Sequence, residues 1–187
     1  MYHHEPIDFI FMKKFIIAFL ILSGCLASVF TASARSKHVQ FPDKKILRYQ
    51  GEFSITAGVT SYNFNLSADF LNGIRWNPYL FTGIGLGIEG GIAELTAPIY
   101  ANVRGYAPIS KKVNMYVGTD IGIKHWLGYA VSRFYAGPEF GFNFEFGKRM
   151  GMNVGVKYDI WCIPVSMNNI EVNKSLNTFG LVVGLVF

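Results

Sequence analysis

The strongest constraint on the fold is a two-residue alternation of apolar and polar side chains. Across residues 47–61 the odd-numbered positions from Leu47 to Val59 are apolar, aromatic or glycine, whereas the even-numbered positions include Arg48, Glu52 and small polar residues. Successive side chains of a β-strand point to opposite faces of the sheet. A period of two therefore predicts a strand with one apolar face and one polar face.

The same alternation recurs along the chain and continues to Phe187. No stretch after residue 35 offers the ~18 consecutive apolar residues of a membrane-spanning helix. An even number of long alternating segments is the sequence signature of a transmembrane barrel. We therefore predict an all-β fold, an eight-stranded antiparallel up-and-down transmembrane β-barrel, with strands at 47–61, 66–76, 79–88, 96–106, 113–125, 134–146, 152–162 and the C-terminal tail.

The charged residues of the predicted strands all fall on the polar face. In a membrane barrel that face lines the interior, whereas in a soluble sandwich or a lipocalin-like ligand binder it lies in water. Alternation alone does not decide between these folds. The barrel prediction makes the following residues an interior charge network: Arg48, Glu52, Asp69, Arg75, Arg104, Asp120, Lys124, Glu139, Glu145, Lys157 and Asp159.

Three further features favour the membrane barrel. The chain carries an N-terminal export signal, its strands exceed the usual ~5–6 residues, and aromatic residues gather near strand ends, as they do at lipid interfaces. The composition agrees, because 51% of the residues are hydrophobic and only 16% are charged. The expected aromatic girdles contain Trp76, Tyr79, Tyr106, Phe146 and Phe187 at one end, and Tyr62, Phe64, Trp126, Tyr129 and Phe134 at the other.

The export signal begins at Met12. Two lysines precede an apolar core, and the small-x-small sequence Ala32-Ser33-Ala34 then forms a cleavage site. We expect 1–34 to be the signal peptide, 1–11 to lie upstream of the true start at Met12, 35–46 to be an N-terminal periplasmic segment and 47–187 to be the barrel.

The alternative within this segment is a lipobox-like stretch that ends at Cys25, which would then be acylated. The residues after Cys25 stay apolar, which favours cleavage after Ala34. That cleavage leaves Cys162 as the single cysteine of the mature chain and excludes a disulfide framework.

Short connections that contain Pro or Gly mark one end of the predicted barrel, at residues 76–79, 107–112 and 147–150. Such connections are typical of periplasmic turns. With an even number of strands, both barrel termini share the periplasmic side. The other connections, around Asn63, Gly91, Gly128 and residues 168–173, are expected to face outward.

Three stretches carry a family resemblance: YQGEFSITAGV, GIRWNPYLFTGIGLGIEGG and the terminal FGLVVGLVF. Over residues 47–187 the chain resembles the small outer-membrane β-barrel (porin-family) proteins of Gram-negative bacteria, in which an aromatic-Asn-Pro-Tyr turn feeds a Gly-alternating strand. The resemblance implies a location in the cell outer membrane, in contact with outer-membrane lipid. We expect a monomer.

The resemblance also implies a role for the last strand. It is similar to the recognition signal that the barrel-assembly machinery reads, in which alternate apolar residues dock as an added strand. The residues concerned are Phe179, Leu181, Val183, Leu185 and Phe187. A purely lipid-facing role for Phe187 is compatible with the same pattern.

The interior of an eight-stranded barrel is just wide enough for side chains to fill it. The predicted interior network holds six acids and five bases, and buried charges need partners. We therefore expect a charge-plugged interior and a structural, envelope-integrity or small-ligand role. The alternative is a narrow channel for small solutes or ions along the same residues.

Other partners and chemistries have little support in the sequence. The net charge of +5 is spread along the chain, so no nucleic acid partner is expected. We predict no metal, because no metal-ligand spacing is present. We also predict no cofactor and no catalytic residues. His125 near Ser132 is the closest approach to the base and nucleophile of a lipid-modifying barrel enzyme, but the spacing matches no motif.

Glycines and prolines complete the pattern. Gly83, Gly85 and Gly87 alternate within a strand and no helix follows, so we expect them to leave room for large interior neighbours rather than bind phosphate.

Pro98 and Pro138 lie inside strands, where each should mark a bulge or a strand end. Asn72 falls on the lipid face, which predicts a register shift or a shorter span there.

Overall fold

The computed structural model describes residues 47–60, 63–91, 95–128, 131–147, 150–167 and 170–187, and for residues 161–176 it describes only the course of the backbone. The expected signal peptide, the alternative lipidation site at Cys25 and the N-terminal segment 35–46 lie outside the described residues. The same holds for Tyr62, Tyr129 and the side chain of Cys162.

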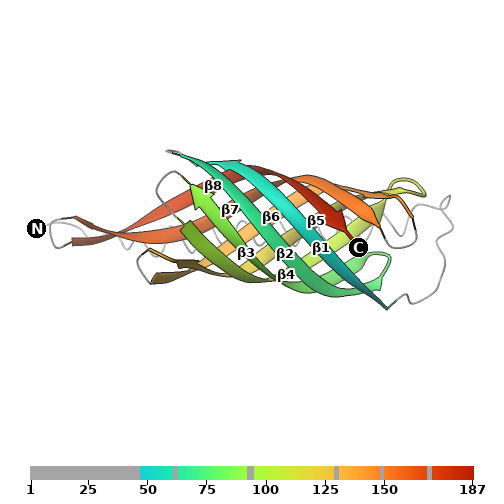
Figure 1. Ribbon diagram of the computed structural model, residues 1–187, viewed down its shortest axis with the longest axis horizontal. Coiled ribbons are helices and arrows are strands. Elements are labelled where there is room, and N and C mark those ends of the chain that lie inside the picture. Colours follow the sequence, from blue (N-terminus) through green and yellow to red (C-terminus); the bar gives the residue numbers. More distant parts are fainter. Residues whose placement is uncertain (1–46, 61–62, 92–94, 129–130, 148–149, 168–169) are drawn as a thin grey trace, which may run out of the picture. The chain divides into compact units, whose positions relative to one another are not determined.

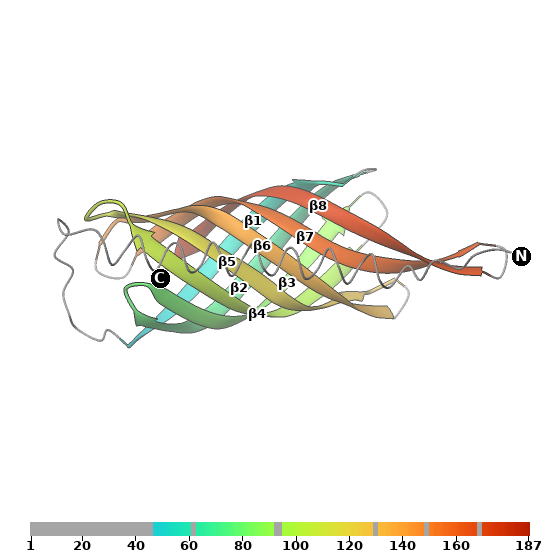
Figure 2. The same cartoon turned by 180° about the vertical axis from the view of Figure 1, so that it is seen from behind.

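The described chain forms a closed, all-antiparallel barrel in which each strand pairs with the next and β8 returns to β1. The strands run obliquely to the long axis of the barrel (Figures 1 and 2). This confirms the predicted eight-stranded up-and-down barrel. Its strands are β1 (Arg48–Val59), β2 (Phe64–Asn77), β3 (Leu80–Gly91), β4 (Leu95–Pro108), β5 (Val113–Trp126), β6 (Val131–Glu145), β7 (Gly151–Met167) and β8 (Ile170–Val186).

The C-terminal strand closes the barrel. β8 pairs with β1 from Glu52↔Val186 to Val59↔Phe179. Beyond the strand, Gly51 and Phe187 exchange two backbone hydrogen bonds of 2.8 and 2.9 Å. We call the end that holds Phe187 and the β2–β3, β4–β5 and β6–β7 connections the turn end, and the opposite end the loop end.

The expected irregularities are only partly present. Pairing of β2 with β1 runs without a break through Asn72, and the β2–β3 register shifts between Arg75 and Asn77 instead. The shift expected at Asn72 was therefore wrong. Asn72 is tolerated on the outer face because its side-chain oxygen accepts a hydrogen bond from the Tyr49 hydroxyl.

The two prolines neither bulge nor end their strands, contrary to expectation. Pairing with β3 is interrupted around Pro98 and resumes in the same register, while Pro98 still pairs with Lys124 of β5. Pro138 likewise lacks a partner on β7 but pairs with Thr119 of β5. A proline lacks only its own N–H, so the ladder is broken on one side and preserved on the other.

β7 and β8 are longer than the sequence indicated. The expected connection at 168–173 is reduced to residues 168–169, because pairing continues to Met167↔Ile170. β6 stops pairing with β7 at Trp161, and β1 stops pairing with β8 at Phe179. The last part of the β7–β8 hairpin therefore extends beyond its neighbours and pairs only with itself, as Figure 1 shows at the loop end.

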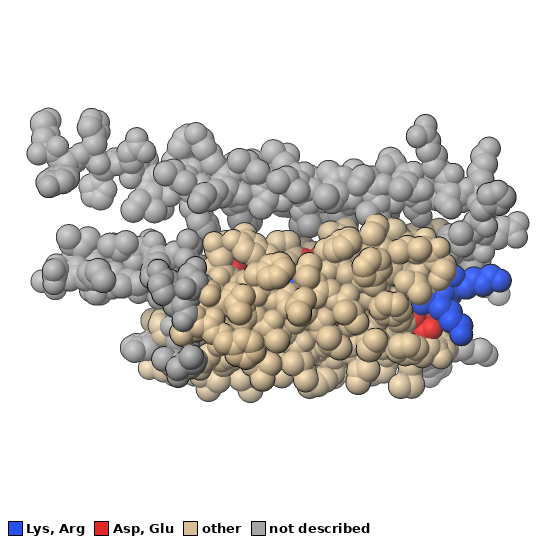
Figure 3. Space-filling view, turned by 90° about the horizontal axis from the view of Figure 1, so that it is seen from above, with Lys and Arg blue, Asp and Glu red and all other residues tan. Residues whose placement is uncertain are grey.

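Apolar side chains face outward, which excludes the soluble sandwich and the lipocalin-like alternative. Ile84, Leu86 and Leu181 are 68%, 59% and 62% exposed, whereas the charged residues named above turn inward. Figure 3 shows an outer surface with few charged atoms along its length. The described residues contain no helix long and apolar enough to cross a membrane.

Most of the described girdle residues are on this outer face, but Trp126 packs, partly buried, against the interior cluster that includes Tyr100 and Tyr135, so its place in a girdle was wrong. Trp76, Phe146 and Phe187 are exposed at the turn end, and Phe64 and Phe134 are exposed at the loop end. Tyr106 was wrongly placed in a girdle, because it is 0% exposed inside the barrel. Its ring lies 4.3 Å beneath the guanidinium of Arg75, so a cation-π contact holds it in the interior.

The outward apolar face yields a first test. Replacing Leu86, midway along β3, by arginine should lower the free energy of unfolding in phospholipid vesicles by ~2–4 kcal/mol, because the charge enters the hydrocarbon. Leu95→Arg, at the loop-end start of β4, should cost only ~0–1 kcal/mol. Urea titrations of both variants measure the difference, and equal small effects would contradict a membrane-facing surface.

Candidate functional site in the barrel interior

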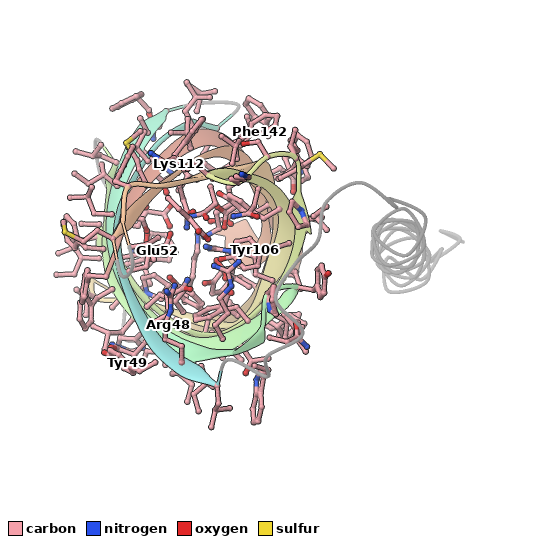
Figure 4. All side chains as sticks on the ribbon, turned by 90° about the vertical axis from the view of Figure 1, so that its right-hand side faces the viewer. Arg48, Tyr49, Glu52, Tyr106, Lys112 and Phe142 are labelled. Atoms are coloured by element: carbon pink, nitrogen blue, oxygen red, sulfur yellow. The ribbon has the colours of Figure 1, made fainter. Side chains whose placement is uncertain are left out.

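The lumen is lined by the polar faces of the strands. In Figure 4, which looks into the turn end, Arg48, Glu52 and Tyr106 point inward, while Tyr49 and Phe142 point away from the axis. The structure places all of the charged residues expected in the interior network on the lumen face. Arg48 and Glu145 are partly exposed, and the following are buried: Glu52, Asp69, Arg75, Arg104, Asp120, Lys124, Glu139, Lys157 and Asp159.

A first cluster, the central cluster, is built around Arg104 of β4. Its guanidinium lies 2.7 Å from a Glu52 oxygen and 3.2 Å from a Glu139 oxygen. Glu52 belongs to β1 and Glu139 to β6, and neither strand is a neighbour of β4. These ion pairs therefore cross the lumen.

Two further groups complete the central cluster. The Tyr116 hydroxyl donates to Glu139, and the Asn153 amide donates to Glu52 at 2.8 Å. The Arg104 guanidinium also lies 4.6 Å from the centre of the Tyr116 ring. Each carboxylate thus receives a neutral donor in addition to the shared cation, as buried ions require.

A second cluster, the loop-end cluster, joins two lysines to three carboxylates. Lys124 lies 2.5 Å from Glu89 and 2.8 Å from Asp159. Lys157 lies 2.8 Å from Asp120 and 3.5 Å from Asp159, so Asp159 is shared by both lysines. The chain of contacts links β3, β5 and β7, which are not neighbours in the sheet.

Tyrosine rings and an amide surround the lysines. Lys124 lies 4.9 Å from the centre of the Tyr135 ring and Lys157 lies 5.5 Å from that of Tyr100. The Asn102 amide donates to Asp120 at 2.7 Å. Asp69, also buried here, accepts a 3.0 Å hydrogen bond from Ser67.

A third cluster, the turn-end cluster, pairs Arg75 of β2 with Glu145 of β6 at 3.3 Å, from opposite sides of the barrel. Arg75 also donates to the Pro78 carbonyl at 2.9 Å. Arg48 lies directly opposite Arg75 in the β1–β2 register. A row of amides connects this cluster to the central one: Asn114 donates to Glu145 and Asn143, Asn143 to Asn153, and Asn153 to Glu52.

Some members of the interior were missed by sequence reasoning. Glu89 was left out because its strand was expected to end at Ile88, although the alternation continues through it. Tyr100, Tyr116 and Tyr135, which are 5%, 1% and 0% exposed, were placed on the polar face by the alternation, but their packing against the cations was not predicted. A tyrosine on a polar face with glycines on adjacent strands is the signal that could have identified them.

The interior glycines make room for these large side chains. A Cβ atom at Gly85 would overlap the Tyr100 ring, one at Gly137 would overlap Asp159, and one at Gly184 would overlap Glu52. The sequence prediction that inward glycines accommodate large neighbours is therefore confirmed for Gly85. Interior packing is complementary, with a missing side chain on one strand opposite a large one on another.

Two small spaces are present in the described network. One space of about 10 Å³ lies among Asp69, Asn102, Arg104 and Asp120, and another of the same size lies beside Arg48 and Arg75. Each is about the size needed for a single water molecule.

His125 and Ser132 do lie together, as a cross-strand pair of β5 and β6. Nδ1 of His125 is 2.8 Å from the Ser132 hydroxyl oxygen. The pair is on the outer face near the loop end, and no carboxylate hydrogen-bonds to His125 among the described residues. Across the described residues, no group of three or more His, Cys, Asp or Glu side chains is placed to hold a metal ion.

No protein-family model and no curated protein sequence matches the chain. Among solved structures, the barrel is similar to Neisserial surface protein A (TM-score 0.57, 13% identity, 74% of this chain and 94% of that chain). Two weaker similarities are the N-terminal β-barrel domain of Pseudomonas aeruginosa OprF (0.49, 10%, 74% and 97%) and the outer membrane enzyme PagL (0.47, 12%, 71% and 97%).

At this identity the likeness to the neisserial surface protein concerns the fold alone. It agrees with the closed barrel and the outward apolar face described above. The chain therefore has the fold of the eight-stranded outer-membrane β-barrels.

The fit between glycines and interior side chains yields a second test. Gly85→Ala should lower the free energy of unfolding by ~1–3 kcal/mol, because the added methyl group overlaps the buried Tyr100 ring. Gly90→Ala, on the same strand, meets only Leu95 at 3.8 Å and should stay within ~0.5 kcal/mol of wild type. Equal stabilities of the two variants would contradict this packing.

Proposed function

We propose that this protein is a non-enzymatic outer-membrane barrel whose interior is plugged by its own charged side chains, with a structural, envelope-integrity or small-ligand role. The observation that carries the proposal is the pairing of Arg104 with Glu52 and Glu139 across the lumen. Side chains that meet from non-neighbouring strands occupy the space that a water-filled pore needs. The Arg75–Glu145 and Lys157–Asp120 pairs repeat this arrangement toward either end.

Electrostatics supports a plug rather than a conducting path. Each buried cation of the central and loop-end clusters contacts two carboxylates, and removing one partner leaves a charge whose desolvation is uncompensated. Opening a continuous path would break several such pairs at once. A closed resting state is therefore the arrangement that these contacts favour.

A narrow channel for ions or small solutes is the second candidate. It is favoured by the small space beside Asp69 and Asp120, because water-sized gaps next to carboxylates could join when the side chains move. Such a path would conduct only in brief events.

A lipid-modifying enzyme is a weaker candidate that rests on His125 and Ser132. A hydroxyl at 2.8 Å from an imidazole is within reach of general-base activation. The pair has no orienting carboxylate among the described residues, and no backbone donors are identified for an oxyanion. A lipid deacylation activity that disappears in His125→Ala would overturn the non-enzymatic proposal.

The remaining expectations concern location and assembly. We propose export through the N-terminal signal, with the turn end and both barrel termini in the periplasm, and a monomer in outer-membrane lipid. Recognition of β8 by the barrel-assembly machinery is supported by its position at the closure and by a row of outward apolar side chains. These side chains, each about half exposed, are Phe179, Leu181, Val183, Leu185 and Phe187.

Single-channel recording tests the plug. Protein extracted from membranes and inserted into a planar bilayer should be folded, as judged by a shift in gel mobility on boiling, and should produce no conductance steps. Frequent discrete steps whose size changes in Glu139→Gln would contradict the plug and favour the channel, because Glu139 would then line a water path.

A further inference from the structure

The turn end carries an exposed surface made from two neighbouring connections. We call it the turn-end patch, and it consists of Ile109, Lys111, Lys112, Phe146 and Met150. The N–H of Glu145 donates to the Lys112 carbonyl at 2.8 Å, which joins the β4–β5 turn to the end of β6. The N–H of Phe146 donates to the Met150 carbonyl at 2.9 Å, which closes the β6–β7 connection beside it.

The patch combines apolar and cationic side chains that all face out. Ile109, Phe146 and Met150 are 56%, 64% and 66% exposed, and Lys111 and Lys112 are also exposed. Neither lysine side chain forms an ion pair with any of the described residues. Figure 3 shows basic side chains at this end, with acidic atoms beside them, on a surface that is otherwise poor in charge.

The apolar part of the patch continues the lipid-facing surface. Phe140 and Phe142 lie on the outer face of β6, Phe146 directly follows the end of that strand, and all three are exposed. Trp76, also exposed at the turn end, donates its indole N–H to Thr82 at 2.7 Å. Aromatic residues of this kind lie where the hydrocarbon gives way to headgroups, so the two lysines are at the level of the lipid phosphates.

We propose that the turn-end patch binds the phosphate groups of anionic phospholipids in the leaflet that surrounds the turn end. The proposal rests on the membrane-spanning barrel proposed above. Lys111 and Lys112 pair with the phosphates, while their aliphatic stems and Ile109, Phe146 and Met150 lie against the upper acyl chains. The apolar half of the patch selects a lipid rather than a soluble anion.

The test is native mass spectrometry of the full-length protein released from vesicles of phosphatidylglycerol and phosphatidylcholine. Wild type should retain phosphatidylglycerol in preference to phosphatidylcholine. That preference should fall about fivefold for each lysine neutralised in Lys111→Gln and Lys112→Gln, which corresponds to ~1 kcal/mol per lysine near an anionic surface. Replacing both lysines by arginine should preserve the preference.

A matched control is available at the loop end. Arg133 donates to the Ser132 carbonyl at 3.3 Å, so Arg133→Gln removes the same charge away from the patch and should leave lipid retention unchanged. Equal retention of phosphatidylglycerol by wild type and the double glutamine variant would overturn the proposal. Displacement of the lipid by millimolar inorganic phosphate would also overturn it, because the site would then bind soluble anions.

The proposed membrane barrel and this inference fail in different ways. Protein that does not insert into vesicles, or does not show the change in gel mobility on boiling, would refute the barrel itself. Protein that inserts and folds but retains both lipids equally would refute only lipid binding by the turn-end patch.

Discussion

The fold depends on pairing the buried charges, which cannot be hydrated, with partners inside the barrel. Arg104 is almost fully buried, and it is held between Glu52 and Glu139 from strands on other sides of the lumen. An isolated charge in this environment is unstable, whereas one with matched partners and additional hydrogen bonds is tolerated. Tyr116 and Asn153 supply those bonds. Each such pair also connects strands that share no backbone hydrogen bonds. The interior ion pairs therefore stabilise the closed sheet.

The interior ion pairs also constrain the interior glycines and the outer face of the barrel. Large polar and aromatic side chains fit inside the barrel because glycines on neighbouring strands leave space, as Gly85 does for Tyr100 and Gly184 for Glu52. With the charges satisfied inside, the outer face can be apolar over most of its length. Among the residues with described side chains, the exposed lysines are Lys111 and Lys112, and both lie in the β4–β5 connection at the turn end. The interior network and the outward apolar face are therefore consequences of one arrangement.

The face of each residue could be predicted from the sequence, but its partner could not. A period of two places Glu52 and Lys157 on the inner face regardless of register. Whether Arg104 meets Glu52, Glu139 or Asp120 depends on the height of each strand along the axis, which is set by the stagger of the closed sheet. Glu89 was missed because strand ends are not marked by alternation. Tyr106 was misplaced because its position near a strand end was given more weight than the alternation, which puts it on the inner face together with Arg104.

The central claim is that Arg104, Glu52 and Glu139 stabilise the barrel as one unit, and a mutant cycle tests it most directly. The free energy of unfolding is measured in phospholipid vesicles for Arg104→Met, for Glu52→Gln with Glu139→Gln, and for all three changes together. Arg104→Met alone should cost ~3–5 kcal/mol because it leaves two carboxylates without their cation. The same change should cost much less once both carboxylates are neutral. Strictly additive losses, in which Arg104→Met costs the same in both backgrounds, would contradict the account.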